Sequence, residues 1–198
     1  MFRLLSLFIG YCFGLIQMAY IIGRFRGIDI REHGSGNSGT TNALRVMGAK
    51  AGIIVFFVDM AKAILAFFIA ISIFGENLSG MYAGLGAILG HCFPFYLKFK
   101  GGKGIACYVG IILSINLMMG LSIVALGFSI LIFTKYMSIT SLFMAGITPV
   151  FLYVWNFSGE IISISVFSAV VCFVMHRDNI ARLIKGTERQ FSFGSKKD

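Results

Sequence analysis

Charged side chains are scarce in this chain of 198 residues. Lys, Arg, Asp and Glu together make up 13% of it, whereas a soluble domain carries about 25%. Hydrophobic residues reach 58% and the mean hydropathy is +0.88. A soluble fold of this size has no interior large enough for so much apolar surface, but a bilayer accepts it as a solvent. The composition therefore predicts an integral membrane protein.

Several chemistries lack the residues that they usually need. The four cysteines lie in or beside apolar runs and form no CxxC pair, which argues against a redox or metal site. The loops hold no carboxylate pair and no Ser or Cys in a recognisable nucleophile motif, which disfavours metal-dependent hydrolysis and acyl-enzyme chemistry. The first apolar run is longer than a signal-peptide core and no A-x-A site follows it, so we expect a retained helix. We expect neither a metal nor a cofactor.

Long apolar runs dominate the rest of the chain. One of them, 105–133, is too long for a single ordinary spanning helix, which needs about 20 residues. It can divide near Asn116 and Gly120. The expected fold is all-α, a single membrane domain over residues 1–198 with seven transmembrane helices. These are at about 4–22, 51–75, 81–97, 105–117, 119–134, 139–157 and 160–175.

The placement of basic residues favours seven helices over six. With the N-terminus outside and the C-terminus cytoplasmic, all Lys and Arg except Arg3 and Lys62 lie in inner loops or in the inner tail. Six helices would move Lys135 and the basic tail to the other side, and the segregation would be lost. The net charge of +9 follows from this topology. It indicates anionic lipid and anionic substrates as partners, and it needs no nucleic acid.

The first polar cluster is the loop from His33 to Arg45. Its glycines allow tight turns and bare backbone N–H groups, its Ser, Thr and Asn side chains are short and polar, and Arg45 adds a cation. Such a loop before a helix is suited to binding an oxyanion or a phosphate, and the alternative is a flexible linker. Its candidate binding residues are Gly34, Ser35, Gly36, Asn37, Gly39, Thr41, Asn42 and Arg45.

The second polar cluster is the turn Gly101-Gly102-Lys103-Gly104. It lacks the spacing and the Ser or Thr of a Walker motif, but it offers backbone donors and an ammonium to an anion. The alternative is an ordinary cytoplasmic turn of positive charge. His91 precedes it, either as a buried structural histidine or as a catalytic one.

The third polar cluster lies just beyond the last apolar run. His176 and Asn179 are three residues apart and share one face of a helix. Lys185 and Arg189 are expected to be anchors at the membrane surface. Within the run 51–75, Asp59 and Lys62 are also three residues apart, and we expect them to form a structural ion pair because intramembrane charges are costly.

Together the clusters predict two anionic ligands meeting at one membrane surface, which favours group transfer between bound substrates. A transporter of a phosphorylated anion stays an alternative, although transporters usually bind near the midplane and contain repeats, and we see no repeat here. A non-catalytic membrane scaffold is the third possibility. It leaves the two glycine-rich loops unexplained.

Three motifs in order resemble the PlsY-type acyl-phosphate:glycerol-3-phosphate acyltransferases of bacteria. They are Gly34-Ser35-Gly36-Asn37-x-Gly39-x-Thr41-Asn42, Gly90-His91-x-Phe93-Pro94 with Gly101-Gly102-Lys103-Gly104, and His176-Arg177-x-Asn179-Ile180-x-Arg182-Leu183. The resemblance implies a seven-helix enzyme of the bacterial inner membrane with its active site facing the cytoplasm. It also implies acyl transfer from acyl phosphate, rather than from acyl-CoA or acyl carrier protein, to the 1-hydroxyl of glycerol 3-phosphate. The product would be lysophosphatidic acid, the first step of phospholipid synthesis.

The resemblance also implies residue roles. The catalytic set is Ser35, Arg45, Lys103, His176 and Asn179. The substrate-binding set is Gly34, Gly36, Asn37, Gly39, Thr41, Asn42, Gly101, Gly102, Gly104 and Ser141. Glu188 matches a structural glutamate, and Cys107 departs from an expected Thr. The general base is either His176 or a phosphate oxygen of the substrate. The expected partners are the two substrates and membrane lipid, and we expect a monomer.

Overall fold

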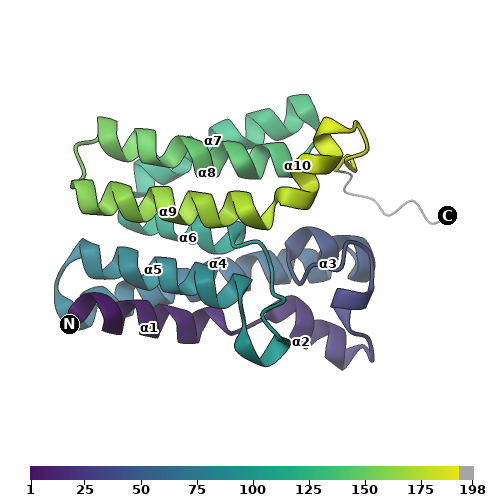
Figure 1. Ribbon diagram of the computed structural model, residues 1–198, viewed down its shortest axis with the longest axis horizontal. Helices are drawn as coiled ribbons and strands as arrows, with labels where there is room; N and C mark the ends of the chain where they lie inside the picture. The colour runs from purple at the N-terminus through teal and green to yellow at the C-terminus, as the bar shows by residue number, and fades with distance from the viewer. Residues whose placement is uncertain (192–198) are drawn as a thin grey trace.

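A computed structural model of the chain describes residues 1–191, and every regular element among them is helical (Figure 1). The α-helices are α1 (Phe2–Gly14), α2 (Met18–Phe25), α3 (Thr40–Met47), α4 (Ala49–Phe74), α5 (Asn77–Cys92), α6 (Ile105–Ile115), α7 (Leu117–Thr134), α8 (Met137–Val154), α9 (Gly159–Met175) and α10 (Arg177–Ile184). Two short 3₁₀ turns, η1 (Ile30–Glu32) and η2 (Phe95–Leu97), lie in the connections.

The long helices lie side by side along one axis. α5 is central, because it contacts α1, α4, α6 and α9. Helices α7, α8 and α9 form one side of the bundle and α1, α4 and α5 form the other, with α6 between them (Figure 1). The N-terminus lies at one end, and the short helices α2, α3 and α10 gather at the opposite end (Figure 1). We call this second end the polar end.

The helices are suited to a lipid solvent. Four segments of the described chain are long and apolar enough to cross a membrane: Phe2–Phe25, Ala49–Phe74, Leu117–Thr134 and Met137–Val154. A fifth is added if α9 and α10, which bend by 60° at their junction, count as one. Large apolar side chains such as Phe57, Phe128 and Val170 are exposed on the outer faces of the helices. In lipid such exposure costs nothing.

Small residues let α1 and α5 approach closely. A Cβ added at Gly10 would lie 1.8 Å from the Ala83 carbonyl oxygen, and one added at Gly86 would lie 2.1 Å from the Leu7 carbonyl oxygen. Such contacts between glycine and backbone are typical of helix packing in membranes, where van der Waals contact takes the place of hydrophobic burial. The position of α5, and of the loop that follows it, therefore depends on this interface.

The structure gives its own bounds for three of the expected apolar runs. The run 4–22 is interrupted between α1 and α2, where Lys62 Nζ donates to the Ile16 carbonyl at 2.5 Å and so satisfies a group that the break frees. The helix expected at 81–97 begins earlier, at Asn77, and ends at Cys92, since a residue before a proline, here Pro94, is disfavoured in helical geometry. The run 105–133 divides at Asn116, whose Oδ1 accepts from the Met119 N–H at 2.9 Å.

Candidate active site

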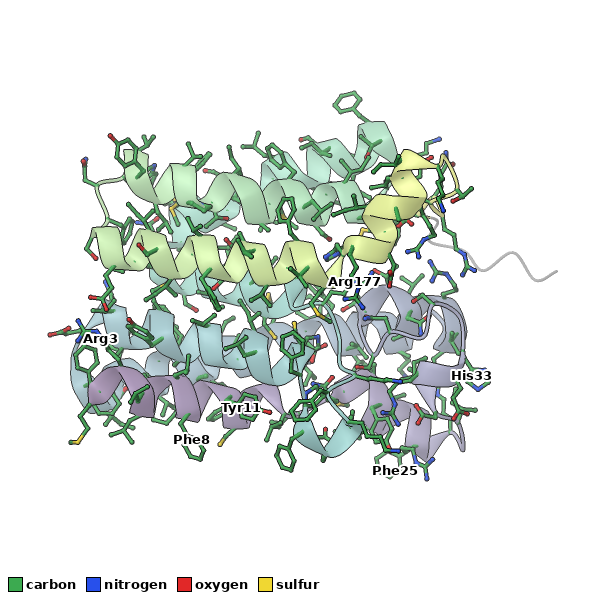
Figure 2. All side chains as sticks on the ribbon, viewed as in Figure 1. Arg3, Phe8, Tyr11, Phe25, His33 and Arg177 are labelled. Carbon is green, nitrogen blue, oxygen red and sulfur yellow. The ribbon has the colours of Figure 1, made fainter. Side chains whose placement is uncertain are left out.

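A cavity of about 880 Å³ lies at the polar end of the bundle. Its walls come from six parts of the chain: α3 with the loop before it, the first half of α4, the end of α5, the loop before α6 with the first residues of α6, the start of α8, and the α9–α10 junction with α10 and the segment after it. In Figure 2, His33 of the first part lies at this end, whereas Arg3 lies at the other. Packing of distant segments therefore brings the three polar motifs together.

Most of the expected site residues line this cavity. Those that line it are Gly34, Ser35, Asn37, Gly39, Thr41, Asn42, Arg45, Lys103, Gly104, Ser141, His176 and Asn179. Gly36, Gly101 and Gly102 do not. Asp59, His91, Arg182, Glu188 and Arg189 also line the cavity, although the sequence motifs did not place them among its binding residues. Arg189 was expected to be a membrane anchor.

The first glycine loop is held in shape by Asn42. Its Oδ1 accepts from the Ser35 N–H at 2.8 Å, and its Nδ2 donates to the carbonyls of Ile30 and His33 at 3.1 and 3.0 Å. Gly34 has a φ of +63°, and an added Cβ there would lie 2.3 Å from Asn42 Oδ1. The buried Asn42 amide is thus occupied by the loop itself. It shapes the wall of the cavity.

The second glycine loop is fastened to the end of α5. The Gly101 N–H donates to the Cys92 carbonyl at 3.1 Å and the Gly102 N–H donates to the His91 carbonyl at 3.0 Å. A Cβ added at Gly102 would lie 2.0 Å from His91 Nε2. These two N–H groups are therefore already paired, contrary to the expectation that they would bind an anion. The glycines are needed for close packing, and the loop contributes Lys103 to the cavity.

Lys103 joins a polar network with α10. Its Nζ donates to Asn179 Oδ1, while Asn179 Nδ2 donates to Glu188 Oε1 at 2.6 Å and Arg182 Nε donates to Glu188 Oε2 at 2.7 Å. Burial opposes ionisation of Glu188, but the hydrogen bonds from Asn179 and Arg182 lower its pKa. Burial, and then the nearby Arg182, lowers the pKa of Lys103 to about 8. The network holds a cation at the cavity wall.

His176 presents an unprotonated nitrogen in this setting. It follows α9 directly and is only 4% exposed. Its Nδ1 lies 2.8 Å from the Cys172 carbonyl oxygen. Because a carbonyl only accepts, we assign the ring proton to Nδ1, which leaves Nε2 as an acceptor. Burial, and then Lys103, lowers the pKa of His176 to about 4. The ring is therefore neutral at physiological pH.

The charge around the cavity is positive. Arg45, Lys103, Arg182 and Arg189 line it, against the carboxylates of Asp59 and Glu188. Asp59 is paired with Lys62, and Glu188 with Arg182. Within residues 1–191, no three His, Cys, Asp or Glu side chains lie together as a metal site would require. An excess of cations around a cavity of this size favours anionic ligands.

Comparison with known proteins agrees with these motifs. The family model described as glycerol-3-phosphate acyltransferase matches residues 4–186. A glycerol-3-phosphate acyltransferase of Thermoanaerobacter sp. (strain X514) is 41% identical over 191 residues, covering 95% of each chain. One of Rhodopseudomonas palustris (strain BisB5) is 40% identical, covering 97% of this chain and 96% of its own.

Solved structures show the same arrangement of helices. A crystal structure of PlsY (YgiH), an integral membrane glycerol 3-phosphate acyltransferase, in its glycerol 3-phosphate form superposes with a TM-score of 0.90. The two sequences are 31% identical, and the match covers 96% of both chains. The lysophosphatidic acid form of that protein gives a TM-score of 0.88 at 30% identity.

Proposed function

Because the chain belongs to the glycerol-3-phosphate acyltransferase family, we propose that it transfers a fatty acyl group from acyl phosphate to the 1-hydroxyl of sn-glycerol 3-phosphate. The products are lysophosphatidic acid and inorganic phosphate, and the reaction is the first step of bacterial phospholipid synthesis. Support comes from the family, and from a similar solved protein with one form named for glycerol 3-phosphate and another for lysophosphatidic acid.

The observation that carries the proposal is the convergence of cations from three motifs on one cavity. Arg45, Lys103 and Arg182 come from segments far apart in the chain and line the same space. Two phosphorylated substrates repel each other, and bringing them together is the main task when the acyl group is already activated as a mixed anhydride. Cations in a partly dry site offset that repulsion strongly, because the effective dielectric constant is low. Holding both reactants then supplies much of the rate.

In the proposed topology seven segments span the bacterial inner membrane. They are α1 with α2, then α4, α5, α6, α7, α8 and α9. The N-terminus is outside, the polar end with its cavity faces the cytoplasm, and the C-terminus is cytoplasmic. The ion pair between Arg3 and Glu160, with 2.6 Å between Nε and Oε1, then lies at the outer face. The short helices α5 and α6 imply local thinning of the bilayer. We expect a single-domain monomer.

The acyl transfer proceeds by attack of the substrate hydroxyl oxygen on the acyl carbonyl carbon. A carbon–oxygen bond forms, the bond from that carbon to the phosphate oxygen breaks, and phosphate leaves with the electron pair. Lys103 and Arg45 bind the phosphate groups, while Ser35 and the loop around Asn37 contact the oxygen that develops negative charge. Asn179 positions Lys103 through its side-chain hydrogen bond.

The hydroxyl proton has two possible acceptors, His176 Nε2 and a phosphate oxygen of the substrate. A phosphate monoester has a second pKa of about 6. This is higher than the pKa of about 4 that burial leaves to His176. The phosphate is therefore the stronger base, and we assign the proton to it. His176 is then left to bind and orient the substrate.

The test is an assay of the purified protein with acyl phosphate and glycerol 3-phosphate, scored for both phosphate release and lysophosphatidic acid. Parallel reactions replace the donor with acyl-CoA or acyl carrier protein. We expect transfer from acyl phosphate alone. Absence of product would overturn the proposal, and vesicle uptake of radiolabelled glycerol 3-phosphate in its place would identify a transporter.

A further inference from the structure

Three ionisable side chains form a buried cluster beneath the catalytic loops. Asp59 and Lys62 of α4 and His91 of α5 are 1%, 2% and 3% exposed. Lys62 Nζ lies 2.7 Å from Asp59 Oδ1 and 2.9 Å from His91 Nδ1. The same ammonium donates to the backbone carbonyls at the break between α1 and α2. Lys62 therefore fixes the other two side chains relative to three helices.

One oxygen of this cluster is left without a partner. Asp59 Oδ2 is buried and accepts no hydrogen bond from any described residue. Asp59 also lines the cavity. A buried carboxylate oxygen without a donor is costly, so native proteins rarely leave one. A donor supplied by a ligand in the cavity would remove that cost.

His91 contacts the other two side chains through Nδ1, which lies 2.9 Å from Lys62 Nζ and 3.6 Å from Asp59 Oδ1. The Lys62 ammonium can only donate, so His91 Nδ1 accepts and the ring proton lies on Nε2. His91 lines the same cavity, and its Nε2 lies against Gly102. A fixed carboxylate repels phosphate groups, whereas its unpartnered oxygen is complementary to the O–H of an alcohol. The part of the cavity lined by Asp59 is thus suited to a hydroxyl group, and the part lined by Arg45 and Lys103 is suited to phosphate.

We propose that Asp59 Oδ2 accepts a hydrogen bond from the non-reacting 2-hydroxyl of glycerol 3-phosphate, with Lys62 and His91 as positioning residues. The inference rests on the proposed function, which supplies the substrate. The 2-hydroxyl is preferred over the reacting 1-hydroxyl for an electrostatic reason. The reacting oxygen must approach an anionic donor, and a carboxylate beside it would add a further negative charge to the reaction centre.

The experiment compares glycerol 3-phosphate with 3-hydroxypropyl phosphate, which keeps the reacting hydroxyl and the phosphate but lacks the 2-hydroxyl. We expect the wild type to prefer glycerol 3-phosphate by roughly 10- to 150-fold in kcat/KM, the usual range for a hydrogen bond to a charged group. Asp59→Asn turns an amide N–H₂ toward the cavity, because its oxygen must face the Lys62 ammonium. The 2-hydroxyl can then only accept from a neutral amide, which is a weaker contact than donation to a carboxylate. In this variant kcat/KM for glycerol 3-phosphate should fall toward that of the analogue, which itself changes little.

Controls separate this effect from a general loss of structure. Glu160→Gln also removes one carboxylate of an ion pair, here with Arg3 at the opposite end of the bundle (Figure 2). This control variant should keep the wild-type preference for glycerol 3-phosphate over the analogue. If Asp59→Asn does not fold, the double variant Asp59→Leu with Lys62→Met removes both buried charges together and should also lose the preference.

The outcomes are distinct. A wild type without preference between the two acceptors overturns the subsite, and so does an equal loss for both acceptors in Asp59→Asn. If the wild type transfers no acyl group from acyl phosphate, the proposed function fails. Competition of the two compounds for binding to purified protein then tests the subsite alone. A preference that Asp59→Asn removes supports it, and equal binding refutes it.

Discussion

The ammonium of Lys103 makes the proposed activity depend on pH in a defined direction. Burial, and then the nearby Arg182, lowers the pKa of this lysine to about 8. Lys103 binds an anion only when it is protonated, so its contribution is present below about pH 8 and is lost as the pH rises above it. A hydrogen bond from a charged donor contributes about 1.5–3 kcal/mol, which corresponds to roughly a 10- to 150-fold change in kcat/KM.

The assay is kcat/KM for glycerol 3-phosphate in the wild type, Lys103→Arg and Lys103→Met, measured from about pH 6.5 to 10. The wild type should decline above about pH 8, by up to tenfold per pH unit. Arginine stays protonated throughout this range, so the decline should disappear in Lys103→Arg, whatever activity that variant retains. In Lys103→Met, kcat/KM should be low at every pH and should show no decline above about pH 8. A bound phosphate stabilises the ammonium, so kcat at saturation should decline at a higher pH than kcat/KM.

Spontaneous hydrolysis of acyl phosphate, measured without enzyme at each pH, is subtracted as the control. The reasoning is refuted if the wild-type profile is flat between about pH 8 and 10, or if Lys103→Arg declines with the same midpoint. Either result would mean that the titrating cation at the cavity wall is not Lys103.

The remaining predictions concern three other positions of the site. His176→Ala should lower transfer by at least about 100-fold while the protein stays folded, and near-full activity would exclude a central role. Gly102→Ala places a Cβ 2.0 Å from His91 Nε2, so the loop must shift. We expect about a 100-fold loss of kcat/KM, and a normal rate would show that the position of the loop is unimportant. Glu188→Gln replaces the carboxylate that accepts from Asn179 and Arg182, and kcat should fall roughly tenfold while the protein stays folded. Unchanged kinetics would show that the network does not position Lys103.

The helices were largely predictable from composition, because apolar runs in lipid must satisfy their backbone groups internally. The boundary at Asn116 was predictable from the sequence, because an asparagine side chain can cap the start of a helix. The breaks at Ile16 and at Cys92 were harder to locate. The first lies within a continuous apolar run, and it is stabilised by Lys62 from another helix.

Some of the cavity residues were likewise predictable from the sequence, and others were not. Glycines, short polar side chains and cations in three loops indicated an anion site, and the resemblance named most of its members. Glu188 and Arg182 were less visible as cavity residues, because a basic segment after a last helix usually anchors the protein at the membrane surface. The bend between α9 and α10 turns them toward Lys103.

The sequence by itself determined that the chain is an apolar helix bundle with its cations gathered in loops, since hydropathy and charge are properties of each residue. It also determined which polar groups are available for chemistry. Only the tertiary structure decided which of those groups are already occupied. The Asn42 amide and the N–H groups of Gly101 and Gly102 are used within the protein, whereas Asp59 Oδ2 has no partner among the described residues. A hydrogen bond requires two groups within about 3 Å, and that proximity is set by how distant segments pack.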